Sequence, residues 1–231
     1  MLAMKGHECL SVAVCAVTVL LLDSPPIFGA PAEVKQKSVV VSHPNLLLNQ
    51  DEIAQIKLKV REYPWAARLL ELVKAKAQKD NSLIENALAY SLTGEATYAT
   101  NVRDQLVREA REQMPHYDKL DVKAEPEWAR WNWWGATAWG YDLAYDVLSS
   151  DERVEIERWL RTAGHTIIAQ ENVLTTTPNL AFDEHWRVGL IGYCLGDHEL
   201  IDWAVNDPGR HGPSRGGFYS VMDTMIRDEQ F

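Results

Sequence analysis

Cysteine is almost absent from this sequence. The chain has 231 residues and three cysteines, and two of these, Cys9 and Cys15, lie close to the start. Cys194 is the one thiol in the rest of the chain, so no internal disulfide can form there and the fold must depend on its hydrophobic core. Its apolar neighbours indicate a buried and unreactive thiol.

The sequence signatures of several enzyme classes are missing as well. There is no H-E-x-x-H motif, no C-x-x-C pair and no ladder of carboxylates, and we therefore expect no metal site. The absence of G-x-S-x-G argues against a serine esterase. No other cofactor is indicated, so we expect the protein to function without one.

Positive charge is scarce. The chain has 23 Lys and Arg against 33 Asp and Glu, which gives a formal net charge of −10. Lys5, Glu8 and Asp23 contribute −1 to the first 32 residues, which leaves −9 for the remainder. An acidic protein is a poor ligand for nucleic acid, and we expect no such partner. An anionic polymer would require positive groups to be gathered locally.

Long apolar runs are missing after the N-terminal segment. The run Leu10–Leu22 has thirteen residues, follows Lys5 and precedes the small residues Ala30 and Ala32. It is short for a membrane span, so residues 1–32 are predicted to be a signal peptide. The protein is then secreted or periplasmic, without stable membrane insertion after cleavage. An uncleaved anchor is the less favoured alternative.

Helical periodicity dominates after a lead-in at residues 33–48. Asn49 and Glu52 form a capping-box pattern, and Gly94 and Gly196 stand where a left-handed residue closes a helix. The predicted helices begin at Asn49 and Pro64 and then cover 83–92, 95–114, 150–172, 179–195, 199–205 and 218–226. A loop is expected at 115–126, and Val154, Ile156, Trp159 and Leu160 are expected to face inward. The sequence predicts an all-α domain of helical hairpins over residues 49–231.

The segment Trp128–Asp146 is unusually aromatic, with five tryptophans and two tyrosines. Its spacing predicts one inner helix with two aromatic stripes. Packing in the core is one explanation for these rings. Trp and Tyr faces also bind sugars, because each offers a flat ring and one polar atom. On this interpretation the substrate-binding residues are Trp131, Trp134, Trp139, Tyr141 and Tyr145.

Asn179, His185 and Arg187 are the strongest candidates for catalysis. They lie at or near the start of a predicted helix that follows a break in the chain, where polar groups can face a cleft. Asn and Arg can donate to a carboxylate, and His can act as a general acid or base. The alternative is structural: His185 could be a satisfied histidine, and Arg187 could pair with Asp183 or Glu184.

Two other polar groups are weaker candidates. Asp142 and Asp146 share a helix face and could serve glycoside hydrolysis, although two acids on one turn more often cap a helix or face solvent. Arg210, His211 and Arg215 lie in a glycine-rich loop that could close over an anionic ligand, with Arg215 as a substrate-binding residue. A solvated loop is the alternative.

Four segments carry a further pattern in their order and spacing: His43–Leu48, Ala87–Gly94, Gly140–Ser149 and Leu190–Asp197. Together they resemble the N-terminal helical domain of alginate lyase and heparinase II/III-type polysaccharide lyases. The resemblance implies an incomplete α/α toroid that is followed by a β-sandwich domain. The chain has room for the first several hairpins only, so we expect it to be truncated at its C-terminal end.

The resemblance also implies β-elimination at a uronic acid of an anionic polysaccharide or oligosaccharide. An amide, Arg or His neutralises the substrate carboxylate, and Tyr or His groups transfer protons. Asn179 and His185 are the positions that match, and the catalytic Tyr is expected beyond Phe231, since Tyr193 and Tyr219 are poorly placed. The leading interpretation is a secreted polysaccharide lyase or its N-terminal part. The alternatives are a non-catalytic carbohydrate-binding helical module and a glycoside hydrolase on a similar toroid.

Overall fold

The described part of the chain is built from helices. The structure is a computed structural model that describes residues 41–117, 134–174, 178–209, 213 and 216–227, and these contain no strand. The predicted all-α class is confirmed. The elements are α2 (Gln50–Glu62), α3 (Pro64–Asp80), α4 (Leu83–Thr93), α5 (Ala96–Tyr117), α7 (Trp134–Leu143), the 3₁₀ helix η1 (Tyr145–Val147), α8 (Ser150–Leu174), α9 (Pro178–Leu195), α10 (His198–Asn206) and α11 (Phe218–Arg227).

The predicted start and stop signals are found at the helix ends. The Asn49 side chain accepts from the Glu52 backbone N–H at 2.9 Å, and the Glu52 carboxylate accepts from the Asn49 N–H at 2.8 Å. Pro64 is the first residue of α3. Gly94 and Gly196 have φ of 73° and 63°, the left-handed conformation that ends a helix. Local sequence therefore determines where these helices begin and end.

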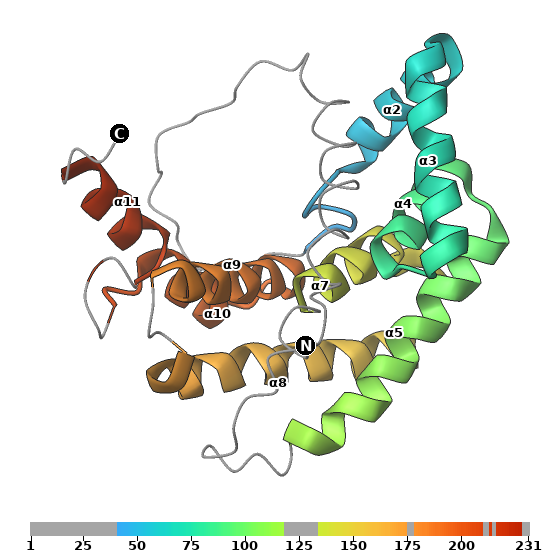
Figure 1. The fold of residues 1–231 in the computed structure, drawn as a ribbon. Helices are drawn as coiled ribbons and strands as arrows, with labels where there is room; N and C mark the ends of the chain where they lie inside the picture. The colour runs from blue at the N-terminus through green and yellow to red at the C-terminus, as the bar shows by residue number, and fades with distance from the viewer. Residues whose placement is uncertain (1–40, 118–133, 175–177, 210–212, 214–215, 228–231) are drawn as a thin grey trace, which may run out of the picture.

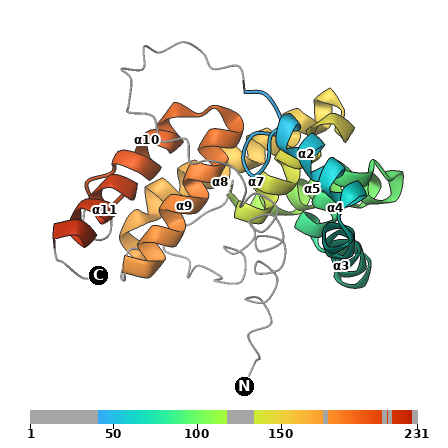
Figure 2. The same ribbon diagram turned by 90° about the horizontal axis from the view of Figure 1, so that it is seen from above.

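The helices form two rows. One row consists of α4, α7 and α9, each packed on the next, with α3 covering α4 and α10 covering α9. The other row consists of α5 and α8, which pack together. Figures 1 and 2 show α2–α4 at one end of the molecule, α9–α11 at the other and α7 between them. This series of hairpins agrees with the sequence-based expectation, and closure into a toroid stays a prediction.

Two glycines allow neighbouring helices to approach closely. A Cβ at Gly140 of α7 would lie 2.8 Å from the Leu83 side chain of α4. A Cβ at Gly192 of α9 would lie 2.9 Å from the backbone nitrogen of Ile201 in α10. Contacts shorter than 3 Å force a shift, so these two helix pairs depend on the missing side chain.

Three predicted details differ from the structure. One helix was predicted over 128–146, and residues 128–133 lie outside the described part. The helix α7 ends at Leu143, because Ala144 leaves the helical conformation and η1 follows. The helix α5 continues to Tyr117, so the start of the predicted loop at 115 is helical. Val154 is 67% exposed, because it lies two residues, or about 200° of helix rotation, from the inward-facing Ile156.

None of the helices within the described ranges combines the length and the apolar character needed to cross a bilayer. The predicted signal peptide, residues 1–32, lies outside these ranges.

Candidate functional site

His185, the predicted catalytic histidine, is enclosed by protein. Its side chain is 3% exposed and its ring stacks on Trp203 at a centroid distance of 3.8 Å. Nδ1 lies 2.7 Å from the Ala181 carbonyl oxygen and Nε2 lies 3.2 Å from Asp207 Oδ2. Both partners are acceptors, so both contacts are satisfied when each nitrogen carries a proton. His185 therefore connects α9 to the segment after α10.

Arg187 and Asn179 do not add an open catalytic group to this cluster. The Arg187 guanidinium is buried and pairs with Asp183 one turn earlier. Burial lowers the pKa of Arg187, and the Asp183 charge opposes that shift. Asn179 lies in the first turn of α9, and its side chain is outside the described part. The structural alternative that the sequence left open for Arg187 is the arrangement observed.

Two of the predicted sugar-binding aromatics are core residues. Trp139 is buried against Trp186 in an edge-on contact with a centroid distance of 5.5 Å. Tyr141 is 0% exposed, its hydroxyl donates to Glu157, and burial followed by that contact raises its pKa. Neither ring offers a face to a sugar, because helix packing covers both. Trp131 and Arg215 lie outside the described residues, and Trp134 begins α7 with a side chain that is likewise outside them.

Tyr145 lies at the surface of a pocket, but neighbouring side chains cover its ring. His43 stacks on it with a centroid distance of 4.1 Å and an interplanar angle of 20°. The Arg153 guanidinium lies 4.0 Å from the ring centroid. Two groups at this distance use both faces of a ring, so Tyr145 can meet a ligand only through its edge and hydroxyl.

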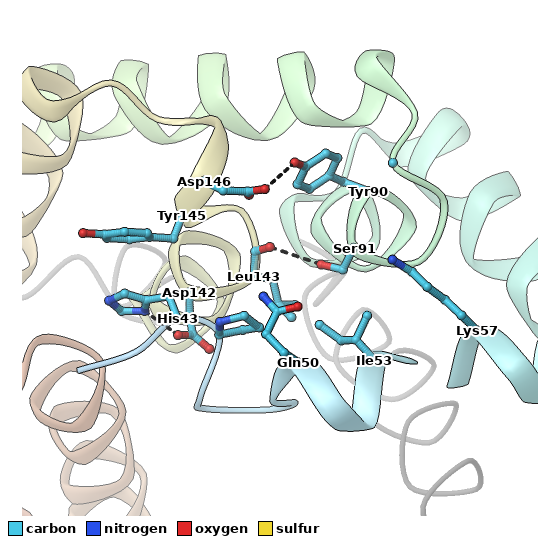
Figure 3. Close-up of a pocket in the computed structure, with 12 residues that line it drawn as sticks. His43, Gln50, Ile53, Lys57, Tyr90, Ser91, Asp142, Leu143, Tyr145 and Asp146 are labelled. Carbon is cyan, nitrogen blue, oxygen red and sulfur yellow. Dashed lines mark hydrogen bonds and ion pairs between the residues drawn. The ribbon is translucent and has the colours of Figure 1, made fainter. Parts of the chain in front are cut away.

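The pocket is formed where α2, the end of α4 and the end of α7 meet (Figure 3). Its volume is about 170 Å³. Gln50, Ile53 and Lys57 line it at spacings of three and four, so they share one face of α2. The polar side chains that line the pocket are His43, Gln50, Lys57, Tyr90, Ser91, Asp142, Tyr145 and Asp146.

Tyr90 and Asp146 form one polar side of the pocket. The Tyr90 hydroxyl donates to Asp146 Oδ2 at 2.8 Å. Partial burial, together with the hydrogen bond and the charge of Asp146, raises the pKa of Tyr90 to about 12. Tyr90 consequently keeps its proton at neutral pH, which makes it a hydrogen-bonding group and a poor general base.

Asp142 anchors the lead-in segment to α7. Its buried carboxylate accepts from His43 Nδ1 at 2.6 Å and from the backbone N–H groups of Asn45 at 2.9 Å and Leu46 at 2.8 Å. These contacts occupy both carboxylate oxygens and give Asp142 a structural role. They also fix the proton of His43 on Nδ1 and leave Nε2 as an acceptor.

His43, Asp142 and Cys194 are the described residues that could hold a metal. One potential ligand atom from each lies within 4.8 Å of the other two. Burial and the nearby carboxylates of Asp142 and Glu157 raise the pKa of Cys194 well above its usual value. The group is therefore a protonated thiol beside a carboxylate whose oxygens are already hydrogen-bonded. These three groups are therefore better explained by the attachment of the lead-in segment to α7 than by a metal site.

Sequence patterns did not identify the pocket residues Gln50, Lys57, Tyr90 and Ser91. Tyr90 and Asp146 are 56 positions apart, and no local motif links them. The i, i+3, i+7 spacing of Gln50, Ile53 and Lys57 was the one available signal, and it is shared by many surface helices.

The sequence was also compared with known proteins. No family model matches the chain, and no curated protein matches it significantly.

Proposed function

We propose that this protein is a secreted or periplasmic polysaccharide lyase, or its helical part, that cleaves a uronic-acid-containing glycan by β-elimination. The observation that carries the proposal is the pocket, which gathers an ammonium group, an amide, hydroxyls and two carboxylates around one small cavity. Such groups bind the hydroxyls and the carboxylate of a sugar. The resemblance of the four hairpin segments and the predicted signal peptide support the same conclusion.

β-Elimination needs a cation at the substrate carboxylate and a base at the adjacent C–H. The base takes the proton, a carbon–carbon double bond forms, and the glycosidic C–O bond breaks. Lys57 is the cation of the pocket. His43 keeps a lone pair on Nε2, because Asp142 holds the Nδ1 proton, but Figure 3 shows it across the pocket from Lys57. The base beside the carboxylate-bearing carbon is therefore expected to be the tyrosine that the resemblance implies.

A specific observation favours a second candidate, a non-catalytic carbohydrate-binding module. His185 and Arg187, the groups expected to carry out catalysis, both contact internal partners. A pocket that retains its polar lining without these groups would bind a sugar and leave its bonds intact.

One experiment separates these functions. The chain is incubated with alginate, polygalacturonate and heparan sulfate, and the ultraviolet absorbance of the unsaturated product is followed beside a calorimetric binding assay. An absorbance gain that is lost in Lys57→Met supports the lyase. Binding without absorbance selects the module, and new reducing ends without absorbance select a glycoside hydrolase. A protein that neither binds nor cleaves any of the three polymers contradicts both proposals.

A further inference from the structure

We propose that the pocket binds one uronosyl residue in a single orientation, with its carboxylate on Lys57 and its hydroxyls on Asp146 and Tyr90. This inference rests on the proposed function and adds the group that selects a uronic acid over a neutral sugar. It makes Lys57 a specificity-determining residue.

Lys57 supplies the positive side of the pocket. It is the one cationic side chain among the lining residues, and it takes part in no ion pair within the described ranges. Figure 3 shows it reaching in from α2, well separated from His43. A lysine without a carboxylate partner in an acidic protein is available to pair with the carboxylate of a ligand.

Asp146 and Tyr90 form the side of the pocket that accepts hydrogen bonds. The Tyr90 hydroxyl donates to Asp146 Oδ2, so the second carboxylate oxygen and the lone pairs of the phenol remain for hydroxyl donors. Asp146 is exposed at the pocket, where a sugar can reach it. Figure 3 shows this pair on a different side of the cavity from Lys57.

Opposite charges on two sides of a small cavity match the chemistry of a uronic acid. Its ring carries a carboxylate at C5 and neutral hydroxyls at C2 and C3. The reversed orientation would bring the sugar carboxylate against Asp146, which like-charge repulsion disfavours. A neutral hexose would leave Lys57 without an anionic partner. The pocket therefore discriminates by charge as well as by shape.

The test measures binding of alginate trisaccharides and of the same trisaccharides after reduction of their carboxyl groups to alcohols. Four proteins are compared: wild type, Lys57→Met, Asp146→Asn and the control Lys59→Met. The control removes the same charge from the same helix at a residue outside the pocket lining. Circular dichroism establishes that each variant is folded.

We expect the wild type and Lys59→Met to bind the acidic trisaccharides about tenfold more tightly than the reduced ones, as one charge-assisted hydrogen bond allows. Lys57→Met should lose that preference and keep its affinity for the reduced sugar. Asp146→Asn should weaken both ligands. This pattern would not arise from a purely structural effect of Lys57.

Equal preference in Lys57→Met and wild type would overturn the orientation while leaving the proposed function in place. Equal binding of acidic and reduced trisaccharides by the wild type would also overturn it. A wild-type protein that binds neither trisaccharide and produces no ultraviolet absorbance on any uronate polymer would contradict the proposed function itself.

Discussion

Two histidine–aspartate pairs hold segments of the chain together, and they differ in how many of the histidine ring nitrogens have a partner. His43 and Asp142 join the lead-in to α7 at a separation of 2.6 Å, and His185 and Asp207 join α9 to the segment after α10 at 3.2 Å. His43 keeps Nε2 free of partners among the described residues and lines a pocket. Both ring nitrogens of His185 are used.

The difference shows how the same two residue types can serve packing or chemistry. A histidine with two internal acceptors links segments of the chain and has no nitrogen left for a ligand. A histidine with one buried carboxylate keeps an accepting nitrogen, which is the arrangement required of a base. Counting the partners of each ring nitrogen therefore distinguishes the two pairs better than burial or sequence context does.

The largest effect is expected from Asp142→Ala. The change leaves His43 Nδ1 and the N–H groups of Asn45 and Leu46 without their acceptor in a buried place. We expect the free energy of unfolding to fall by about 3–5 kcal/mol in urea titrations. Asp142→Asn keeps one accepting oxygen and should lose less. A loss below about 1 kcal/mol in Asp142→Ala would show that the anchor is dispensable.

His185→Ala tests the other end of the comparison. It removes the stack on Trp203 and the contact with Asp207, so we expect the free energy of unfolding to fall by about 2–4 kcal/mol. Binding of alginate trisaccharides at low temperature, where the variant is folded, should stay within about twofold of wild type. A folded variant that no longer binds would place His185 in the site.

Glu109 provides a half-buried carboxyl group that has no histidine partner. Burial raises its pKa to about 7, although Arg108 and the Thr137 hydroxyl lower it. In the unfolded chain this group loses its proton near pH 4.5, so its protonated form favours the fold and stability should fall as pH rises from about 4.5 to 7.

Glu109→Gln should remove this part of the pH dependence and raise the free energy of unfolding at pH 8 by about 1–3 kcal/mol. Chemical denaturation at pH 5 and pH 8 measures it. The comparison with Glu112→Gln, which carries the same change one turn along α5, controls for net charge. An identical pH slope in wild type and Glu109→Gln would contradict the assignment.

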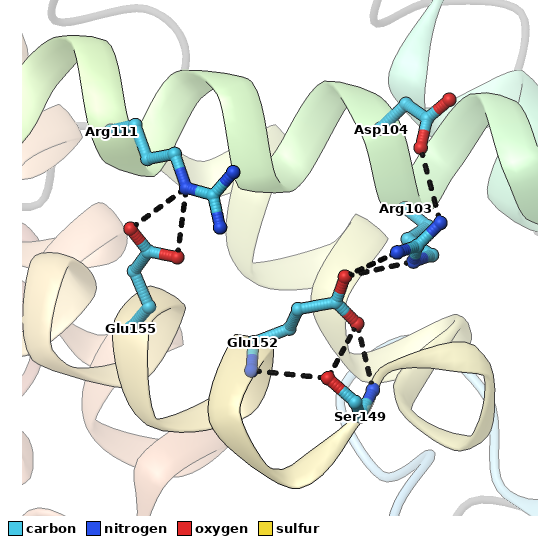
Figure 4. Close-up of polar contacts among 6 residues, drawn as sticks. All are labelled: Arg103, Asp104, Arg111, Ser149, Glu152 and Glu155. Carbon is cyan, nitrogen blue, oxygen red and sulfur yellow. Dashed lines mark hydrogen bonds and ion pairs between the residues drawn. The ribbon is translucent and has the colours of Figure 1, made fainter.

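The smallest effect belongs to the ion pairs between α5 and α8. Arg103 donates to Glu152, which also accepts from Ser149, and Arg111 pairs with Glu155 nearby (Figure 4). The hydrogen bond from Arg103, followed by those from Ser149, lowers the pKa of Glu152 to about 2. Their stabilisation is present above about pH 4.5 and is lost as pH falls towards 2.

Glu152→Gln should therefore flatten the loss of thermal stability between pH 4.5 and 2.5. Solvent screening keeps the contribution at neutral pH below about 1 kcal/mol. Glu155→Gln, the neighbouring surface pair, is the matched control. A steeper acid transition in Glu152→Gln than in wild type would have the wrong sign.

The sequence predicted the helices well because their ends depend on local residues. The capping box at Asn49 and the closing glycine at Gly94 act within one turn, so they can be recognised without tertiary structure. The candidate site was predicted poorly because its contacts are distant in sequence. His43 meets Asp142 across 99 positions, and Tyr90 meets Asp146 across 56.

The aromatic residues illustrate the same limit. Periodicity placed Trp139 and Tyr141 on an inner helix, but it could not show which neighbour covers each ring. That information depends on how α7 packs against α9 and against the lead-in segment. The spacing of residues within one helix does not identify which other segments contact them.

The anchor at Asp142 also has a consequence for the order of biosynthesis. His43 and Pro44 form part of the pocket wall, yet this segment is held by a residue that the ribosome adds about one hundred positions later. Until α7 has been synthesised, this segment has no Asp142 to bind and is accessible to proteases. A cut just after Pro44 would remove both residues while leaving every helix of the described structure intact.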